Sequence, residues 1–212
     1  KQPFIQPALL EVGTLLACVQ RKCLMPKQSP TCPLVWVIAL SLYPSMKNST
    51  STKGVYCMSL KVIQPGLLSV LQDLGRYGQH NIGLTNGGPL DSEAFLWANR
   101  ILKNSPNACA IEVSFGGLHL VAQTESFLCV TGAQLELSIN DVVKPMWTSH
   151  KVRKEDQIKL GFSSHGCRSY LGVAGGFSIV PSFGSAATVM REKIGGLNGT
   201  KLTGDDVLPC ET

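Results

Sequence analysis

The strongest constraint on the fold is a succession of short apolar runs in residues 58–212, each ended by glycine or another turn-forming residue. Nineteen of the 21 glycines lie in this part of the chain, about 12% of its residues against ~7% in an average protein. Runs of this length at close spacing are typical of a β-barrel or sandwich. The sequence therefore predicts a mostly β fold, with strands at 60–63, 67–71, 111–113, 118–121, 127–130, 135–139, 158–160 and 169–173.

Two of the turns are predicted to close hairpins. The strictly alternating run 135–139 reaches Asn140-Asp141 and returns through Val142-Val143, which is a strong hairpin signal. The runs 111–113 and 118–121 flank Gly116-Gly117, so a second hairpin is predicted there.

Residues 90–102 depart from the strand pattern. The i, i+3, i+4, i+7 spacing of an amphipathic helix is met by four apolar residues, Ala94, Trp97, Ala98 and Ile101. Asp91 suits the N-cap position, and Pro106 with the two residues before it ends the pattern. The sequence predicts a helix over 90–102, with Trp97 packed in the core.

A change in composition near Met58 divides the chain. Residues 1–57 carry six Lys or Arg and one acid, a net charge of +5, which leaves thirteen bases and thirteen acids for residues 58–212. Four of the eight cysteines but only two glycines lie in residues 1–57. Since residues 1–57 show no sustained helix or strand period, we expect a poorly ordered, non-domain extension at 1–57 and one domain at 58–212. A targeting segment is the open alternative for the extension.

Charge, hydropathy and cysteine spacing exclude several classes. The balanced charge of residues 58–212 offers no field for a nucleic acid, and no run approaches the ~20 apolar residues that span a bilayer. Cys18, Cys23 and Cys32 do not follow zinc-site spacing, and no histidine precedes His80, so no metal site is expected. The scattered thiols of residues 58–212 favour a reducing, cytoplasmic setting.

The common catalytic motifs are missing from the sequence: no Walker loop, G-x-G-x-x-G, H-E-x-x-H or G-x-S-x-G is present. His165 and Cys167 stand two positions apart, so one face of a strand could hold both as a Cys–His pair. The favoured interpretation is that Cys167 is a small buried residue and that His165 lies at a turn. The sequence therefore assigns no catalytic residue.

Polar residues crowd into residues 72–91, among glycines that let a backbone approach a ligand. Six of them are candidate substrate-binding residues: Gln72, Asp73, Arg76, His80, Asn86 and Asp91. Asp73 and Arg76 could form an ion pair, and Arg76 could bind a carboxylate with two hydrogen bonds. An ordered turn in which Asp73 caps backbone N–H groups explains the same residues, and both interpretations stay open.

The same region carries a resemblance to a known family. The run from Val62 to Arg76, Val-Ile-Gln-Pro-Gly-Leu-Leu-Ser-Val-Leu-Gln-Asp-Leu-Gly-Arg, resembles the opening of the biotin-dependent carboxyltransferase-type family, which includes the C subunit of 5-oxoprolinase, the second subunit of allophanate hydrolase and the matching domain of urea amidolyase. Further similar runs follow in order at 87–91, 98–99, 111–117, 130–133, 168–177, 184–188, 195–197 and 204–205. The resemblance covers residues 58–209 and none of residues 1–57.

The resemblance implies a cyclophilin-like β-barrel with one short helix, behind an irregular N-terminal extension. It also implies an ATP-dependent hydrolase of small amides that opens 5-oxoproline to glutamate, with other subunits of the same complex as partners and ATP used by the assembled enzyme. One alternative is a carboxyltransferase that moves a carboxyl group from biotin to urea or a similar small amide. A non-catalytic binding module is the other alternative.

Two features depart from the family pattern. Family members are about twice as long as residues 58–212, so this chain is expected to hold the N-terminal half and to be inactive alone. Ala186 follows Ser185 at a position where the family places arginine, so an anion contact from this position is not expected.

Overall fold

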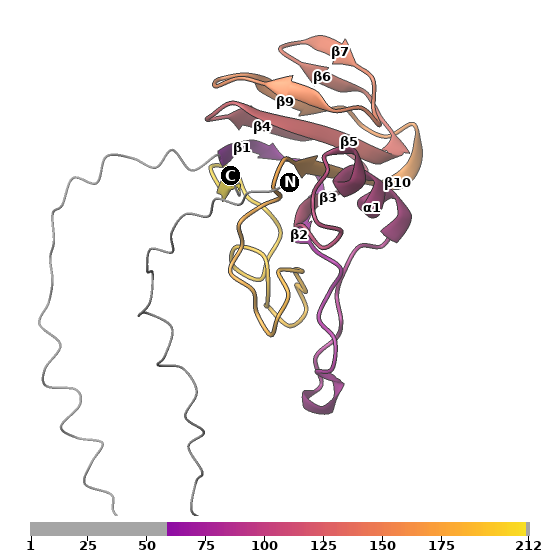
Figure 1. Ribbon diagram of the computed structural model, residues 1–212, viewed down its shortest axis with the longest axis vertical. Coiled ribbons are helices and arrows are strands. Elements are labelled where there is room, and N and C mark those ends of the chain that lie inside the picture. The colour runs from indigo at the N-terminus through magenta and orange to yellow at the C-terminus, as the bar shows by residue number, and fades with distance from the viewer. Residues whose placement is uncertain (1–58, 211–212) are drawn as a thin grey trace, which may run out of the picture. The chain divides into compact units, whose positions relative to one another are not determined.

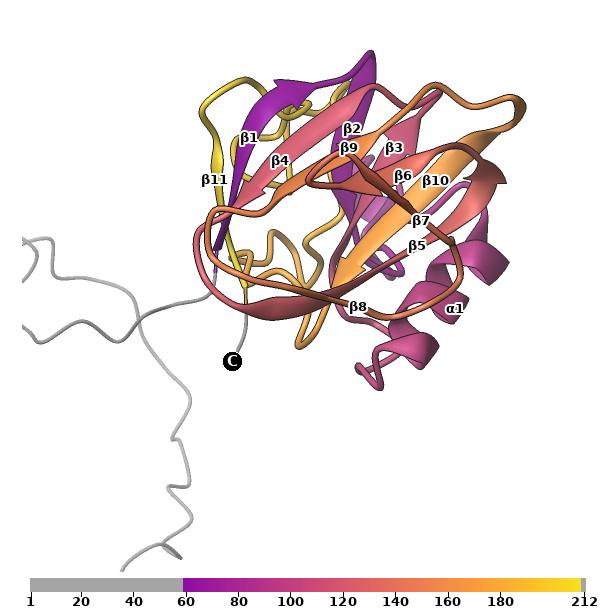
Figure 2. The same cartoon turned by 90° about the horizontal axis from the view of Figure 1, so that it is seen from above.

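The computed structural model describes residues 59–210, which form two antiparallel sheets and one α-helix (Figures 1 and 2). The predictions for residues 1–57 lie outside this range. The six-stranded sheet has the order β11 (Val207–Pro209), β1 (Ser59–Pro65), β4 (Leu118–Ala122), β9 (Gln157–Leu160), β6 (Leu137–Ile139) and β7 (Val142–Lys144). The five-stranded sheet has the order β2 (Leu68–Gln72), β3 (Ala110–Ser114), β10 (His165–Val173), β5 (Ser126–Gln134) and β8 (His150–Val152). The mostly β prediction with one short helix is confirmed.

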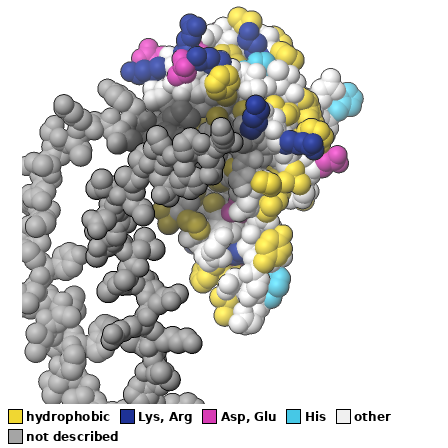
Figure 3. Space-filling view, viewed as in Figure 1, with side chains coloured by type: hydrophobic (Ala, Val, Ile, Leu, Met, Phe, Trp, Pro, Cys, Tyr) yellow, Lys and Arg dark blue, Asp and Glu magenta, His cyan; other side chains and the backbone are white. Residues whose placement is uncertain are grey.

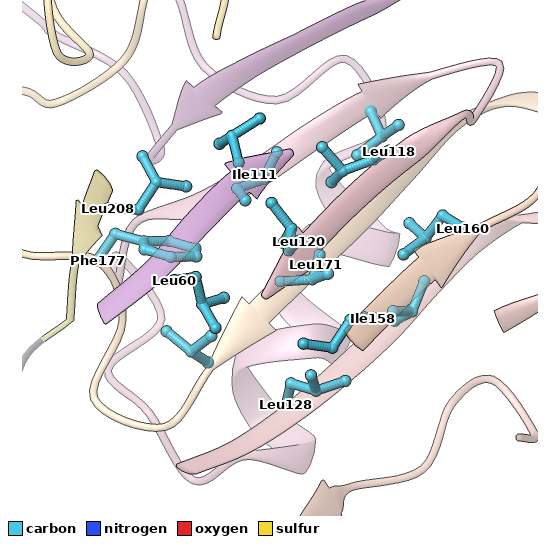
Figure 4. Packing of buried hydrophobic residues seen from close by; sticks show 14 of the residues in the cluster. Leu60, Ile111, Leu118, Leu120, Leu128, Ile158, Leu160, Leu171, Phe177 and Leu208 are labelled. Atoms are coloured by element: carbon cyan, nitrogen blue, oxygen red, sulfur yellow. The ribbon is translucent and has the colours of Figure 1, made fainter. Parts of the chain in front are cut away.

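The core lies between the two sheets (Figure 4). In β4, Leu118, Leu120 and Ala122 are buried while the residues between them are partly exposed, as the two-residue period of a strand requires. Leu120 packs in the same apolar cluster as Leu171 of β10, from the opposite sheet. The apolar runs of the sequence are therefore the inner faces of the two sheets.

The barrel is not closed within the described residues, because isolated bridges such as Gly116–Phe162 take the place of a continuous ladder between the sheets. The predicted hairpin at Gly116-Gly117 is wrong, because β3 belongs to one sheet and β4 to the other. The chain turns a corner there instead. Gly66, between β1 and β2, lies against this corner, and a side chain on Gly66 would collide with the carbonyl oxygen of Gly116. Glycine is needed because both residues have positive φ angles, 72° and 95°.

The predicted hairpin at Asn140-Asp141 is confirmed. Strands β6 and β7 pair with Ile139 opposite Val142, and the two turn residues have φ angles of 52° and 61°. Two consecutive positive φ angles define a type I′ turn, which matches the twist of the flanking strands.

The predicted helix is α1 (Ser92–Ile101), and the side chain of Asp91 caps it by accepting a hydrogen bond of 3.0 Å from the Ala94 N–H. Its buried face is turned by about one residue from the predicted one. Phe95 is fully buried and meets Tyr170 edge to face, whereas Trp97 is 41% exposed and lies beside the Arg100 guanidinium. The core position predicted for Trp97 is therefore wrong, because the aromatic residue that faces the sheet is Phe95.

The surface carries mixed charge. In Figure 3 basic and acidic side chains lie close together near the top of the molecule, and apolar side chains are scattered over the lower loops. Among residues 59–210 no helix is long and apolar enough to cross a membrane.

Candidate functional site

The first candidate region is the turn that follows β2. Asp73 is 4% exposed, and its Oδ1 accepts hydrogen bonds from the Gly75 N–H at 2.8 Å and the Ser185 hydroxyl at 2.6 Å. Its Oδ2 accepts from the Ala186 N–H at 2.7 Å. The carboxylate thus shapes its own turn and fastens to it a segment more than 100 residues away in the sequence.

Arg76 joins the same two segments. Its side chain is 1% exposed, with Nε donating to the Ser182 carbonyl at 3.4 Å and Nη2 donating to the Ala187 carbonyl. No ion pair forms between Arg76 and Asp73 among the described residues. Gly195 packs against the guanidinium, since a Cβ there would lie 3.0 Å from Nη2. Nη1 is buried and has no partner among the residues of the structure.

Gln72 and Asn86 complete this cluster. The Gln72 amide donates to the Thr188 carbonyl and accepts from the Gly88 N–H, both at 3.1 Å. The Asn86 carbonyl accepts a hydrogen bond of 2.7 Å from the Arg76 N–H, while the Asn86 Oδ1 is buried without a partner in the described part of the chain. The structure therefore brings together four of the six predicted site residues, and most of their hydrogen bonds hold loops in place.

The other two predicted residues lie elsewhere. His80 is exposed at the start of the 3₁₀-helix η1 (His80–Ile82). Asp91 is exposed at the beginning of α1, with its backbone N–H donating to the Tyr170 hydroxyl at 2.8 Å. A ligand role for the six residues stays a prediction.

The second candidate region is a cavity of about 460 Å³ where β5 and β10 meet the start of α1. It is lined by residues 132–134 of β5, residues 165–168 of β10, Leu90 and Asp91. We call it the β5–β10 cavity.

A bulge in β10 shapes this cavity. His165 pairs with Gln134 and Ser169 pairs with Gly132, so three residues of β10 lie opposite one residue of β5. Bulges of this kind redirect side chains away from the regular alternation. Cys167 is consequently exposed, which corrects the prediction that it is buried.

The bulge does not produce the Cys–His pair considered from the sequence. The His165 Nδ1 lies 3.3 Å from the Ser164 hydroxyl, and no hydrogen bond joins His165 to Cys167 within residues 59–210. A Cys–His nucleophile therefore has no support in the geometry.

A buried carboxylate, that of Glu112, contacts two residues of the cavity lining, Leu90 and Arg168. The Glu112 Oε2 accepts from the Tyr170 hydroxyl at 2.7 Å and from the Leu90 N–H at 2.9 Å. Burial, and in smaller part the neighbouring Glu112, raises the pKa of Tyr170 well above its usual value, so the hydroxyl stays protonated and donates to Glu112. The other oxygen, Oε1, forms an ion pair with the Arg168 Nε at 3.4 Å.

Glu112, Tyr170 and Arg168 were not among the predicted site residues. Glu112 stands between apolar neighbours in the run Ile111-Glu112-Val113. A carboxylate in the middle of a buried strand needs a partner, and this signal in the sequence could have drawn attention to the region.

Comparison with known proteins points to one family. The model of the family described as "Carboxyltransferase domain, subdomain A and B" matches residues 82–212 of this chain. The chain is 36% identical over 152 residues to the C subunit of 5-oxoprolinase from Escherichia coli, a match that covers 71% of this chain and 48% of that protein. It is 35% identical over 153 residues to urea amidolyase of Lachancea kluyveri, a match that covers 71% of this chain and 8% of that protein.

Solved structures agree with these sequence similarities. The crystal structure of Kluyveromyces lactis urea amidolyase matches 74% of this chain and 10% of its own, with a TM-score of 0.71 and 32% sequence identity. The chain thus spans about half the length of the 5-oxoprolinase relative and a small part of the urea amidolyases.

Proposed function

Because this chain belongs to the carboxyltransferase domain family, subdomain A and B, we propose that it contributes a β domain to an ATP-dependent enzyme that hydrolyses 5-oxoproline to glutamate. The observation that carries the proposal is the 36% identity to a 5-oxoprolinase polypeptide over 152 residues. A match of this length is not confined to one motif, and it is as long as the whole described domain.

The proposed activity belongs to an assembly. The relative is a subunit by name, and this chain spans 48% of its length. We therefore propose that the activity requires other subunits of the same complex. We also propose that this domain binds the small amide substrate when it is assembled with those subunits. A cytoplasmic location completes the proposal, since Cys129 and Cys167 are thiols, as a reducing compartment allows.

The described residues offer few groups for the phosphates of ATP. Helix N-termini, lysines and arginines are the usual phosphate-binding groups. The N-terminus of α1 is already capped by the Asp91 carboxylate, and Arg168 is the one lysine or arginine in the linings of the β5–β10 cavity and of the cavity beside Asp73. We therefore assign no ATP-dependent step to this domain and place ATP on the partner subunits.

Reconstitution tests the proposal. The full chain is combined with the other subunits of a 5-oxoprolinase, and glutamate formation from 5-oxoproline is measured with and without ATP. Glutamate should form only when the chain and ATP are both present. Equal glutamate formation without the chain would contradict the proposal.

A second function is favoured by a separate observation, the similarity to urea amidolyases in both sequence and structure. In that case the domain would accept a carboxyl group from biotin and transfer it to urea. The two functions separate in one assay, because carboxyl transfer requires a biotin carrier and urea, whereas ring opening requires neither.

A further inference from the structure

Arg168 is the one arginine that lines the β5–β10 cavity. Of its five N–H donors, only one has a hydrogen-bond partner in the described chain, the Cys167 carbonyl at 3.3 Å from Nη1. The Nε–H makes no hydrogen bond there, although the Glu112 Oε1 lies 3.4 Å away. The edge of the guanidinium that carries Nη1 and Nη2 is therefore largely unused.

Glu112 fixes the position of Arg168 without occupying this edge. Its Oε2 is already held by two hydrogen bonds, from Tyr170 and Leu90, so the carboxylate cannot turn toward Nη1 and Nη2. Its Oε1 meets the guanidinium only through Nε. The arginine is thus anchored at one edge and open at the other, a geometry suited to a planar carboxylate.

The other groups of the cavity are compatible with a small acid. Asp91 is its one acidic lining residue, and the Asp91 Oδ1 is engaged by the helix at the Ala94 N–H. His165 and Gln134 add two further nitrogen-bearing side chains to the lining. The volume of about 460 Å³ lies in the range of small-molecule sites, roughly 300–1,000 Å³.

We propose that the β5–β10 cavity binds a small carboxylic acid and that Arg168 is the residue that binds its carboxylate, with Glu112 as the positioning residue. The identification of the acid as 5-oxoproline rests on the proposed function, because the carboxylate of 5-oxoproline is the one charged group on an otherwise neutral lactam ring. Urea carries no carboxylate and would not use this site.

Cys167 supplies a built-in reporter of occupancy, because its exposed thiol lies in the cavity lining. The 212-residue chain is treated with iodoacetamide, and the alkylation rate of Cys167 is measured by mass spectrometry of its own peptide, so that other cysteines do not interfere. Cys129 serves as an internal control, since burial raises the pKa of its thiol to about 11 and keeps it unreactive.

We expect 5-oxoproline to slow alkylation of Cys167 with a dissociation constant in the millimolar range. 2-Pyrrolidinone, the same ring without the carboxylate, should bind at least about tenfold more weakly, the loss expected for a charge-assisted hydrogen bond. Arg168→Gln should weaken 5-oxoproline by a similar factor, whereas Arg153→Gln, an exposed arginine outside the cavity, should leave it unchanged.

The comparison of 5-oxoproline with 2-pyrrolidinone uses the unaltered protein. It therefore tests the proposal even if Arg168→Gln folds poorly. Equal binding of 5-oxoproline and 2-pyrrolidinone, unchanged binding in a folded Arg168→Gln chain, or no protection of Cys167 at saturating acid would overturn the proposal. Acetate and inorganic phosphate separate a carboxylate site from a general anion site, and stronger protection by phosphate would also count against it. Protection through Arg168 without 5-oxoproline turnover in the assembled enzyme would keep the site and reject the proposed function.

Discussion

At the scale of single residues, Arg76 connects two loops that lie far apart in the sequence. It is the largest fully buried side chain of the described domain, and it donates hydrogen bonds to the carbonyls of Ser182 and Ala187. The Ala187 carbonyl is buried and would lose its donor with the arginine, at a cost of about 1–3 kcal/mol, whereas the Ser182 carbonyl also accepts from the Ser185 N–H at 3.3 Å. The side chain therefore holds the turn after β2 against the loop that follows β10.

We expect Arg76→Ala to lower the free energy of unfolding by about 3 kcal/mol, from lost hydrogen bonds and the space left behind. Urea unfolding followed by circular dichroism measures the change. Arg153→Ala removes an exposed arginine and provides the control. If Arg76→Ala kept its stability but abolished turnover in the assembled enzyme, the ligand role of Arg76 would replace the structural one.

At the scale of elements, the corners between the two sheets depend on glycine. Gly116 has a φ angle of 95°, and a Cβ on it would collide with the carbonyl oxygen of Gly161. Gly78 has a similar φ angle of 77°, but nothing lies within 4 Å of the position of its Cβ. Alanine substitutions at the two positions therefore separate two free-energy costs, that of a positive φ angle and that of a steric clash.

We expect Gly78→Ala to cost about 1 kcal/mol, the strain of a non-glycine residue at positive φ. Gly116→Ala should cost about 3 kcal/mol or more, because the clash adds to the same strain. Thermal unfolding of the two variants measures the difference. Equal losses would show that the corner relaxes freely and that its close packing contributes nothing.

The elements also show how far sequence reasoning reaches. The hairpin at Asn140-Asp141 was predictable because two residues that tolerate positive φ follow a strictly alternating strand. The corner at Gly116 was not predictable from the sequence. Two short apolar runs that flank glycines have the same sequence pattern whether the two strands pair with each other or belong to different sheets. The rotation of α1 that leaves Trp97 exposed depends on its contact with β5 and β10, which the local spacing does not contain.

Part of the candidate site was predictable from the sequence and part was not. Asp73 and Arg76 were found from the sequence because they share one short turn with glycines. The Glu112–Arg168 pair joins residues 56 positions apart through the pairing of β3 with β10, and only the sheet register brings them together.

At the scale of the whole molecule, several surface carboxylates make the free energy of unfolding depend on pH in the acid range. Hydrogen bonds from Lys159 and Lys61 hold the pKa values of Asp141 and Asp205 below their usual value of 3.8. A backbone hydrogen bond from Arg153 does the same for the pKa of Asp156. Since the folded state binds protons more weakly than the unfolded state, these groups stabilise the fold fully above pH 3.8, and their contribution is lost as the pH falls through the lowered folded values.

We therefore expect the free energy of unfolding to fall with decreasing pH in this acid range, with no change from these groups between about pH 5 and 7. Urea titrations at a series of pH values measure the slope. Lys159→Met removes the partner of Asp141 and should make the slope smaller. A slope that is the same in this variant would show that the pair does not perturb the Asp141 carboxyl.

The central claim, that this chain supplies a domain to a 5-oxoproline hydrolase, is tested most directly by titrating the full chain into a fixed amount of partner subunits and following glutamate formation at saturating ATP. We predict a rate that rises with the amount of chain and saturates once the partner subunits are fully occupied. A rate that stays at the level of the partner subunits alone, with both sheets folded and complex formation verified, would contradict the claim.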